Sequence, residues 1–142
     1  MSDAAGLVLL VGRVLFSVFI LYAAFGHVTQ GQMMVGYARA KAFPLATFAG
    51  WPAGVYLGVA ALSLLLGIWP DIRAIMLGLF VIPAALYFHN FWTVKDAAAK
   101  RTEQGNFLRN VALLGAALAL FALFASVGTG LKFVITAPLI RF

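Results

Sequence analysis

Four long apolar runs dominate this sequence and limit what it can fold into. They cover residues 6–29, 48–69, 73–92 and 107–127. An α-helix crosses the hydrocarbon core of a bilayer in about 20 residues, and each run is long enough for that. The runs therefore predict four transmembrane helices.

The bulk composition agrees with a membrane protein. Hydrophobic residues make up 64% of the 142 residues and charged residues only 10%, whereas a soluble domain has about 25% charged and about 45–50% apolar residues. The length suits one unit of ordinary domain size, so we expect a single transmembrane domain over residues 1–142. The absence of cysteine excludes disulfides, thiolate metal sites and cysteine nucleophiles.

An even number of spans places both chain termini on one side of the membrane. The predicted fold is an all-α integral membrane four-helix bundle with antiparallel, up-down topology. A short C-terminal tail, Leu131–Phe142, follows the last span. The first run lacks the basic start of a signal peptide and exceeds the ~7–15 apolar residues usual there, so we expect it to be retained as a span.

The distribution of positive charge favours one orientation by a thin margin. Residues 30–47 and 93–109 hold six of the ten Lys and Arg residues, and the other side of the membrane holds four. The positive-inside rule then places the first and third connections in the cytoplasm. In a membrane chain, the net charge of +6 indicates loops that face anionic lipid rather than nucleic acid.

Proline and glycine mark several details of the spans. Pro70, followed by an aspartate, predicts the turn that makes the second and third spans antiparallel neighbours. Pro83 lies inside the third span, removes one amide hydrogen bond and predicts a kink. Gly54 and Gly58 are four residues apart, a spacing that fits close packing between helices.

Polar side chains gather at the membrane face formed by the first and third connections. Arg13, deeper in the first span, shares a helical stripe with His27 and with the small Ser17. Asn106 is in addition predicted to be the N-cap of the fourth helix. The candidate site residues are His27, His89, Asn90, Asn106, Arg109, Asn110 and Arg13.

These residues leave alternatives open. Arg13 either extends its side chain to the membrane surface or has a buried partner, which would be a carbonyl group, a lipid phosphate or another subunit, because no span contains an acid. His27 and His89 have no suitably spaced third ligand, so we predict no metal or haem. They form either a polar tie between helix ends or a contact with a lipid headgroup or quinone oxygen.

Three stretches of the sequence carry a family resemblance. They are "GRVLFSVFILYAAFGHVTQ" (12–30) in the first span, "LLLGIWPDIRAIML" (64–77) in the second-to-third hairpin, and "FHNFW" (88–92) followed by "QGNFLRNVALLGAALAL" (104–120). In these stretches, and most specifically in the last, the chain resembles the DoxX family of small four-span bacterial membrane proteins. The resemblance covers most of the chain.

The resemblance implies a non-catalytic or accessory subunit of a membrane-bound oxidoreductase or respiratory-type assembly. Its place would be the bacterial cytoplasmic membrane as a multi-pass protein, its partners lipid and other membrane subunits, and its candidate ligand quinone. Two departures argue against shared proton or ion chemistry. Residues 48–69 contain no acid, and His27 follows Gly26 where the family often has lysine.

Two other functions compete with this one. An enzyme acting alone is disfavoured, because the chain lacks cysteine, an acid within its spans, a Ser-His-Asp constellation and a nucleotide-binding loop. The alternative is a small transporter or lipid-binding helper that acts as a homo-oligomer. Arg13 and Pro83, both inside spans, are the features that would suit it.

Overall fold

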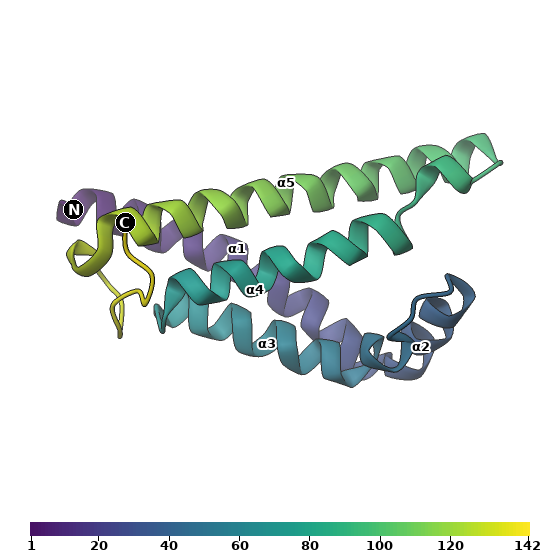
Figure 1. The fold of residues 1–142 in the computed structure, drawn as a ribbon, viewed down its shortest axis with the longest axis horizontal. Coiled ribbons are helices and arrows are strands. Elements are labelled where there is room, and N and C mark those ends of the chain that lie inside the picture. The colour runs from purple at the N-terminus through teal and green to yellow at the C-terminus, as the bar shows by residue number, and fades with distance from the viewer.

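The computed structural model describes all residues 1–142 and contains helices but no β-strand (Figure 1). The all-α prediction is therefore confirmed. The five α-helices are α1 (Asp3–Thr29), α2 (Gly31–Ala40), α3 (Trp51–Leu66), α4 (Pro70–Pro83) and α5 (Ala97–Val127). Short helical turns are η1 (Ala46–Ala49), η2 (Ala84–Phe88), η3 (Phe91–Thr93) and η4 (Gly128–Gly130).

Three helical stretches are long and apolar enough to span a membrane, which indicates a membrane protein. They are Asp3–Thr29, Pro70–Thr93 and Ala97–Gly130. The fourth predicted span, 48–69, is represented by the shorter apolar helix α3. This helix stops at Gly67, whose positive φ of 70° takes the chain out of the helical conformation.

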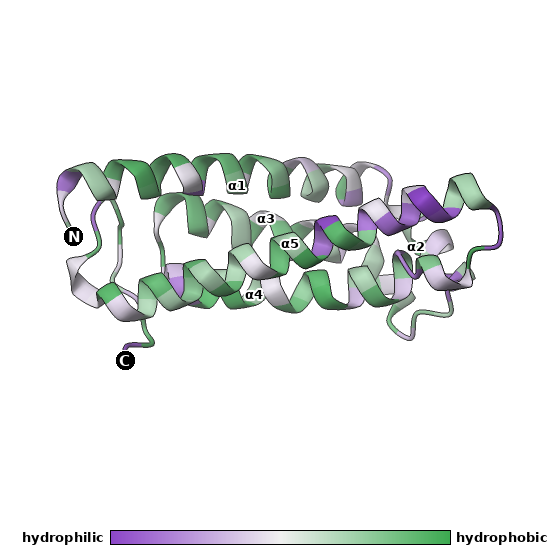
Figure 2. Cartoon of the chain, turned by 90° about the horizontal axis from the view of Figure 1, so that it is seen from above, coloured by the Kyte–Doolittle hydropathy of each residue, from purple (hydrophilic) through white to green (hydrophobic).

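The long helices pack in the order α1, α3, α4, α5, and the first and last of these make little contact with each other. Both termini lie at one end of the molecule, as predicted, and α2 lies at the other (Figure 1). Figure 2 shows hydrophobic residues along most of the four long helices. It also shows hydrophilic residues gathered on the part of α5 at the end of the molecule that holds α2, so the predicted polar asymmetry is present.

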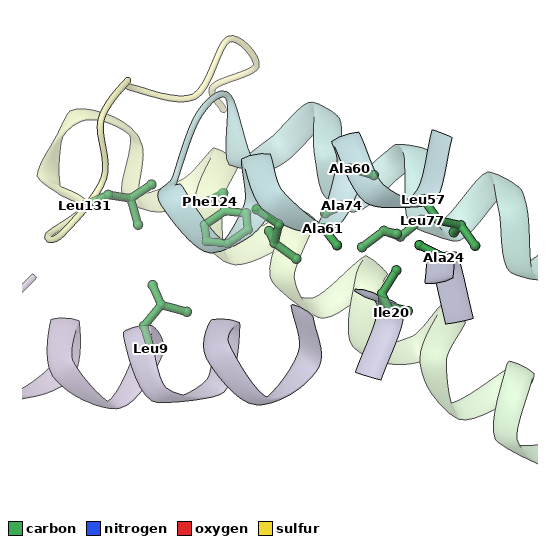
Figure 3. Packing of buried hydrophobic residues seen from close by; sticks show 11 residues of the cluster. Leu9, Ile20, Ala24, Leu57, Ala60, Ala61, Ala74, Leu77, Phe124 and Leu131 are labelled. Carbon is green, nitrogen blue, oxygen red and sulfur yellow. The ribbon is translucent and has the colours of Figure 1, made fainter. Parts of the chain in front are cut away.

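Small residues allow these helices to approach closely. Eleven buried side chains form the core (Figure 3): Leu9, Ile20, Ala24, Leu57, Ala60, Ala61, Leu64, Ala74, Leu77, Phe124 and Leu131. A Cβ atom on Gly54 would lie 2.5 Å from Val28 Cγ2 and 2.8 Å from the carbonyl oxygen of Ala24. A Cβ on Gly58 would meet nothing within 4 Å. Only Gly54 of the predicted pair is therefore a contact point, between α3 and α1.

The regular geometry of the third span changes at Pro83. The α-helical hydrogen bonding of α4 ends there, and the chain continues through the wider π-helical turn η2. At the junction the Ala84 amide donates to the carbonyl groups of both Phe80 and Val81. The change of helical pitch alters the direction in which the residues after Pro83 point, and His89 is the first residue after this turn.

The prediction that Asn106 caps the fourth helix is wrong. Helix α5 begins at Ala97, and its cap is Asp96, whose side chain accepts a hydrogen bond of 2.8 Å from the Ala99 amide. The intervening segment is rich in Ala, Lys, Glu and Gln, which are strong helix formers. These residues extend the helix beyond the apolar run, and Asn106 lies inside it.

The C-terminal tail, residues 131–142, folds back on the end of the bundle that holds the termini. The amide groups of Ile135 and Thr136 donate to the Gly67 carbonyl at 3.1 and 3.0 Å. Those of Leu139 and Ile140 donate to Asp71 Oδ2 at 3.0 and 2.8 Å. The tail is therefore held by hydrogen bonds from its own amide groups, to the Gly67 carbonyl and to the Asp71 side chain, and closes this end of the core.

Candidate functional site

A cavity of about 760 Å³ opens among the helices near the α2 end of the molecule. All five α-helices contribute to its wall, together with the segment that joins α2 to α3. Nineteen of its 24 lining residues are hydrophobic. This size and an apolar wall with a few polar groups are typical of sites for small organic ligands.

The cavity brings together four of the seven predicted site residues, namely His27, His89, Arg109 and Asn110. Asn90, Asn106 and Arg13 are not part of its wall. Most of the remaining wall is apolar. Its aromatic members are Phe19, Tyr37, Phe43, Phe48, Tyr56, Phe80 and Phe88.

His27 lies in the last turn of α1 and is held there by a backbone group of the segment before α3. Its Nδ1 atom is 2.6 Å from the carbonyl oxygen of Ala49. The ring meets that of Phe80 edge to face, at 5.8 Å between centroids. Because a carbonyl oxygen can only accept, Nδ1 must carry the proton of this hydrogen bond. The geometry thus fixes both the position and the tautomer of the neutral ring.

His89 follows the turn η2 and pairs with an acid that was not predicted. Its Nδ1 atom is 2.8 Å from Glu103 Oε2, and the two side chains are 26% and 24% exposed. Glu103 lies in a part of α5 that was predicted to belong to the third connection. Once that segment is known to be helical, Glu103 falls on the same face as Asn106 and Asn110, which is the signal that could have identified it.

Two tyrosines complete the polar wall and were also missed. The hydroxyl group of Tyr37 donates to the Phe88 carbonyl at 3.0 Å, and that of Tyr56 donates to the Met76 carbonyl at 2.8 Å. Burial, and to a smaller extent the negative charge of Glu103, raise the pKa of Tyr37. The hydroxyl group of Tyr37 therefore stays protonated at neutral pH and keeps its role as a donor.

The asparagines are used mainly within the protein. Asn110 Nδ2 donates to the Asn106 carbonyl at 3.0 Å. Asn90 Oδ1 accepts from Lys41 Nζ at 3.0 Å and so ties the first connection to the third. Arg109 differs from them, because its exposed side chain has no ion pair or hydrogen bond with another residue.

Arg13 lies outside the cavity and is 1% exposed. Its Nη2 atom donates to the carbonyl groups of Leu65 at 2.6 Å and Phe133 at 2.9 Å. The interpretation that this side chain extends to the membrane surface is therefore wrong. Its partners are carbonyl groups, one of the alternatives left open, and it links α1 to α3 and to the tail.

No group of three or more His, Asp or Glu side chains is arranged to hold a metal ion. No protein-family model, curated protein or solved structure matches the chain. The resemblance to the DoxX family thus stays a prediction, and the cavity is the main observation from which function can be argued.

Proposed function

We propose that this protein is a four-span membrane subunit. In the cavity between its helices it binds a lipophilic molecule with a polar head, which is either a quinone or a lipid with its headgroup. The observation that carries the proposal is the cavity itself, about 760 Å³ in volume and apolar except for a few polar side chains. Such a volume accommodates a molecule of drug-like size.

Packing supports the fourth span. Helix α3 lies between α1 and α4, and Ala60, Ala61 and Leu64 on its inner face are fully buried. A helix packed along its length between two membrane-spanning neighbours shares their depth. The flanking turn η1 and residues 67–69 lengthen it, so that the region 48–69 crosses with α3 as its helical part.

The wall of the cavity changes character along the helices. Phe19 and Ile20 line its deeper part, and His27 on the same helix lies about 11 Å further toward the α2 end, at 1.5 Å per residue. The apolar part suits a hydrocarbon chain or ring. The polar part suits oxygen atoms, which His27, His89 and Arg109 can contact.

The ligand would arrive from the lipid phase. Helices α1 and α5 make little contact, so no tight helix–helix seam closes the bundle on that side. A molecule dissolved in the bilayer can therefore enter between these two helices without crossing water. This route suits quinones and lipids better than soluble metabolites.

The role in the cell follows from the resemblance to the DoxX family. We place the protein in a bacterial cytoplasmic membrane as an accessory, non-catalytic subunit of an oxidoreductase or respiratory-type assembly. The observation that favours the alternative, a homo-oligomeric lipid-binding helper, is Arg109, a cation in the cavity wall without an acidic partner. An anionic headgroup would supply that partner.

A substitution that fills the cavity tests the binding role. Ala23→Trp adds an indole ring to the cavity wall, and we expect it to weaken binding of a long-chain hydroquinone, the reduced form of a quinone, at least about tenfold. Binding is measured by titration of the detergent-purified protein. The matched control is Tyr22→Trp, because Tyr22 is highly exposed and does not line the cavity.

Equal affinities of the two variants would contradict binding in this cavity.

Purification in mild detergent distinguishes the accessory subunit from the homo-oligomeric lipid-binding helper. Other membrane subunits should co-purify with an accessory subunit, whereas a stable homo-oligomer without them would favour the lipid-binding alternative.

A further inference from the structure

We infer that the cavity selects ligands whose polar head bears a hydroxyl group that can donate a hydrogen bond, over the same molecules without that O–H. This inference rests on the proposed binding role and narrows it to a class of ligand, which among quinones is the reduced, hydroxyl-bearing quinol. It depends on which atoms of the polar wall are already engaged within the protein and which remain free.

The first free acceptor is on His27. Since Nδ1–H donates to the Ala49 carbonyl, Nε2 of the neutral ring carries a lone pair and no proton. Nε2 has no hydrogen bond within the protein, and the residue lines the cavity. A ligand that meets this atom must therefore bring the proton of the hydrogen bond itself.

The second free acceptor is on His89. A carboxylate can only accept, so the contact with Glu103 again places a proton on Nδ1, and in the neutral ring the lone pair is then on Nε2. Carboxylate partners are known to fix the tautomer of histidines in this way. The two histidines thus present the same chemistry to the cavity from α1 and from the end of the third span.

The two tyrosines add further hydrogen-bond acceptors to the cavity wall. Tyr37 and Tyr56 each donate their single hydroxyl proton to a backbone carbonyl group, at Phe88 and Met76. Toward a ligand, their oxygen atoms can therefore only accept.

Arg109 is the strongest donor that remains in the wall, and Asn110 retains one N–H beside its free Oδ1. Four side chains that can only accept, those of His27, His89, Tyr37 and Tyr56, thus stand against one that can only donate, that of Arg109. An ether or ester head would bury these acceptors unpaired, which is costly, whereas a hydroxyl head supplies the missing proton.

A matched pair of probes tests the inference on the intact wild-type protein. 4-Dodecylphenol and its methyl ether, 4-dodecylanisole, have the same ring and chain, but only the phenol donates. We expect the phenol to bind at least about tenfold more tightly in titrations of the protein in lipid nanodiscs. Equal binding of both probes would overturn the inference and leave the proposed function standing. Binding of neither would overturn both.

Variants of the histidines test the assignment to these atoms. In His27→Phe and in His89→Phe, an apolar ring replaces the acceptor, so the phenol should lose affinity while the ether keeps its own. A purely structural role would instead weaken both probes by the same factor. A phenol preference that survives in both single variants and in the double variant would overturn the assignment.

Discussion

Replacing Gly54 with alanine should lower the free energy of unfolding by about 3 kcal/mol, the upper part of the range for overpacked sites. The added Cβ would lie 2.8 Å from the carbonyl oxygen of Ala24 and 3.0 Å from the amide nitrogen of Val28. Both atoms belong to the backbone of α1, which cannot yield as a flexible side chain would. Helices α1 and α3 must therefore separate along their main contact.

The measurement is the unfolding transition in detergent, followed by circular dichroism. Gly58→Ala is the matched control, because it lies one turn further along α3 and its Cβ would meet nothing within 4 Å. Alanine also favours a helix over glycine by about 1 kcal/mol, so this control should be unchanged or slightly more stable. Similar destabilisation of both variants would contradict the packing of α1 on α3.

Replacing Asp71 with leucine should release the C-terminal tail from the bundle. Asp71 is fully buried, and its Oδ2 atom accepts from the amide groups of both Leu139 and Ile140. Without this acceptor, each of the two amide groups costs about 1–3 kcal/mol as long as it stays out of contact with water. Detachment of the tail into water avoids this cost and is therefore the expected result.

Limited proteolysis detects the release. Trypsin cleaves after Lys132, at the start of the tail, and we expect the rate of this cleavage to rise at least about tenfold in Asp71→Leu. Asp71→Asn retains a side-chain oxygen that can accept both hydrogen bonds, so it should remain close to wild type. If leucine and asparagine gave the same cleavage rate, Asp71 would not be what holds the tail.

Much of the fold could be predicted because hydrophobicity controls it. The spans 6–29, 73–92 and 107–127 each coincide with a helical stretch that can cross a membrane. Pro70, at the predicted turn, is the first residue of α4, a position that suits proline. These features depend on local sequence, and no partner distant in the chain is needed to specify them.

The errors arose where local propensity or distant partners decide the structure. Asn106 was predicted to cap a helix, because the apolar run 107–127 begins directly after it, whereas the helix-forming residues after Asp96 start α5 earlier in the chain. The partner of His89 lies in that extension. Helix α2 was predicted only as a connection, although it supplies Tyr37 to the cavity wall.

The two carbonyl partners of Arg13 also impose an order on biosynthesis. The Leu65 carbonyl is 52 residues away in sequence and that of Phe133 is 120 residues away. Arg13 is thus made well before either partner, and the second leaves the ribosome only after all four long helices. Until α3 has been synthesised and packed against α1, the guanidinium group of Arg13 therefore needs other partners, such as lipid phosphate or water. The hydrogen bond to the Phe133 carbonyl can therefore form only after all four long helices have been synthesised, when the tail packs against this end of the bundle.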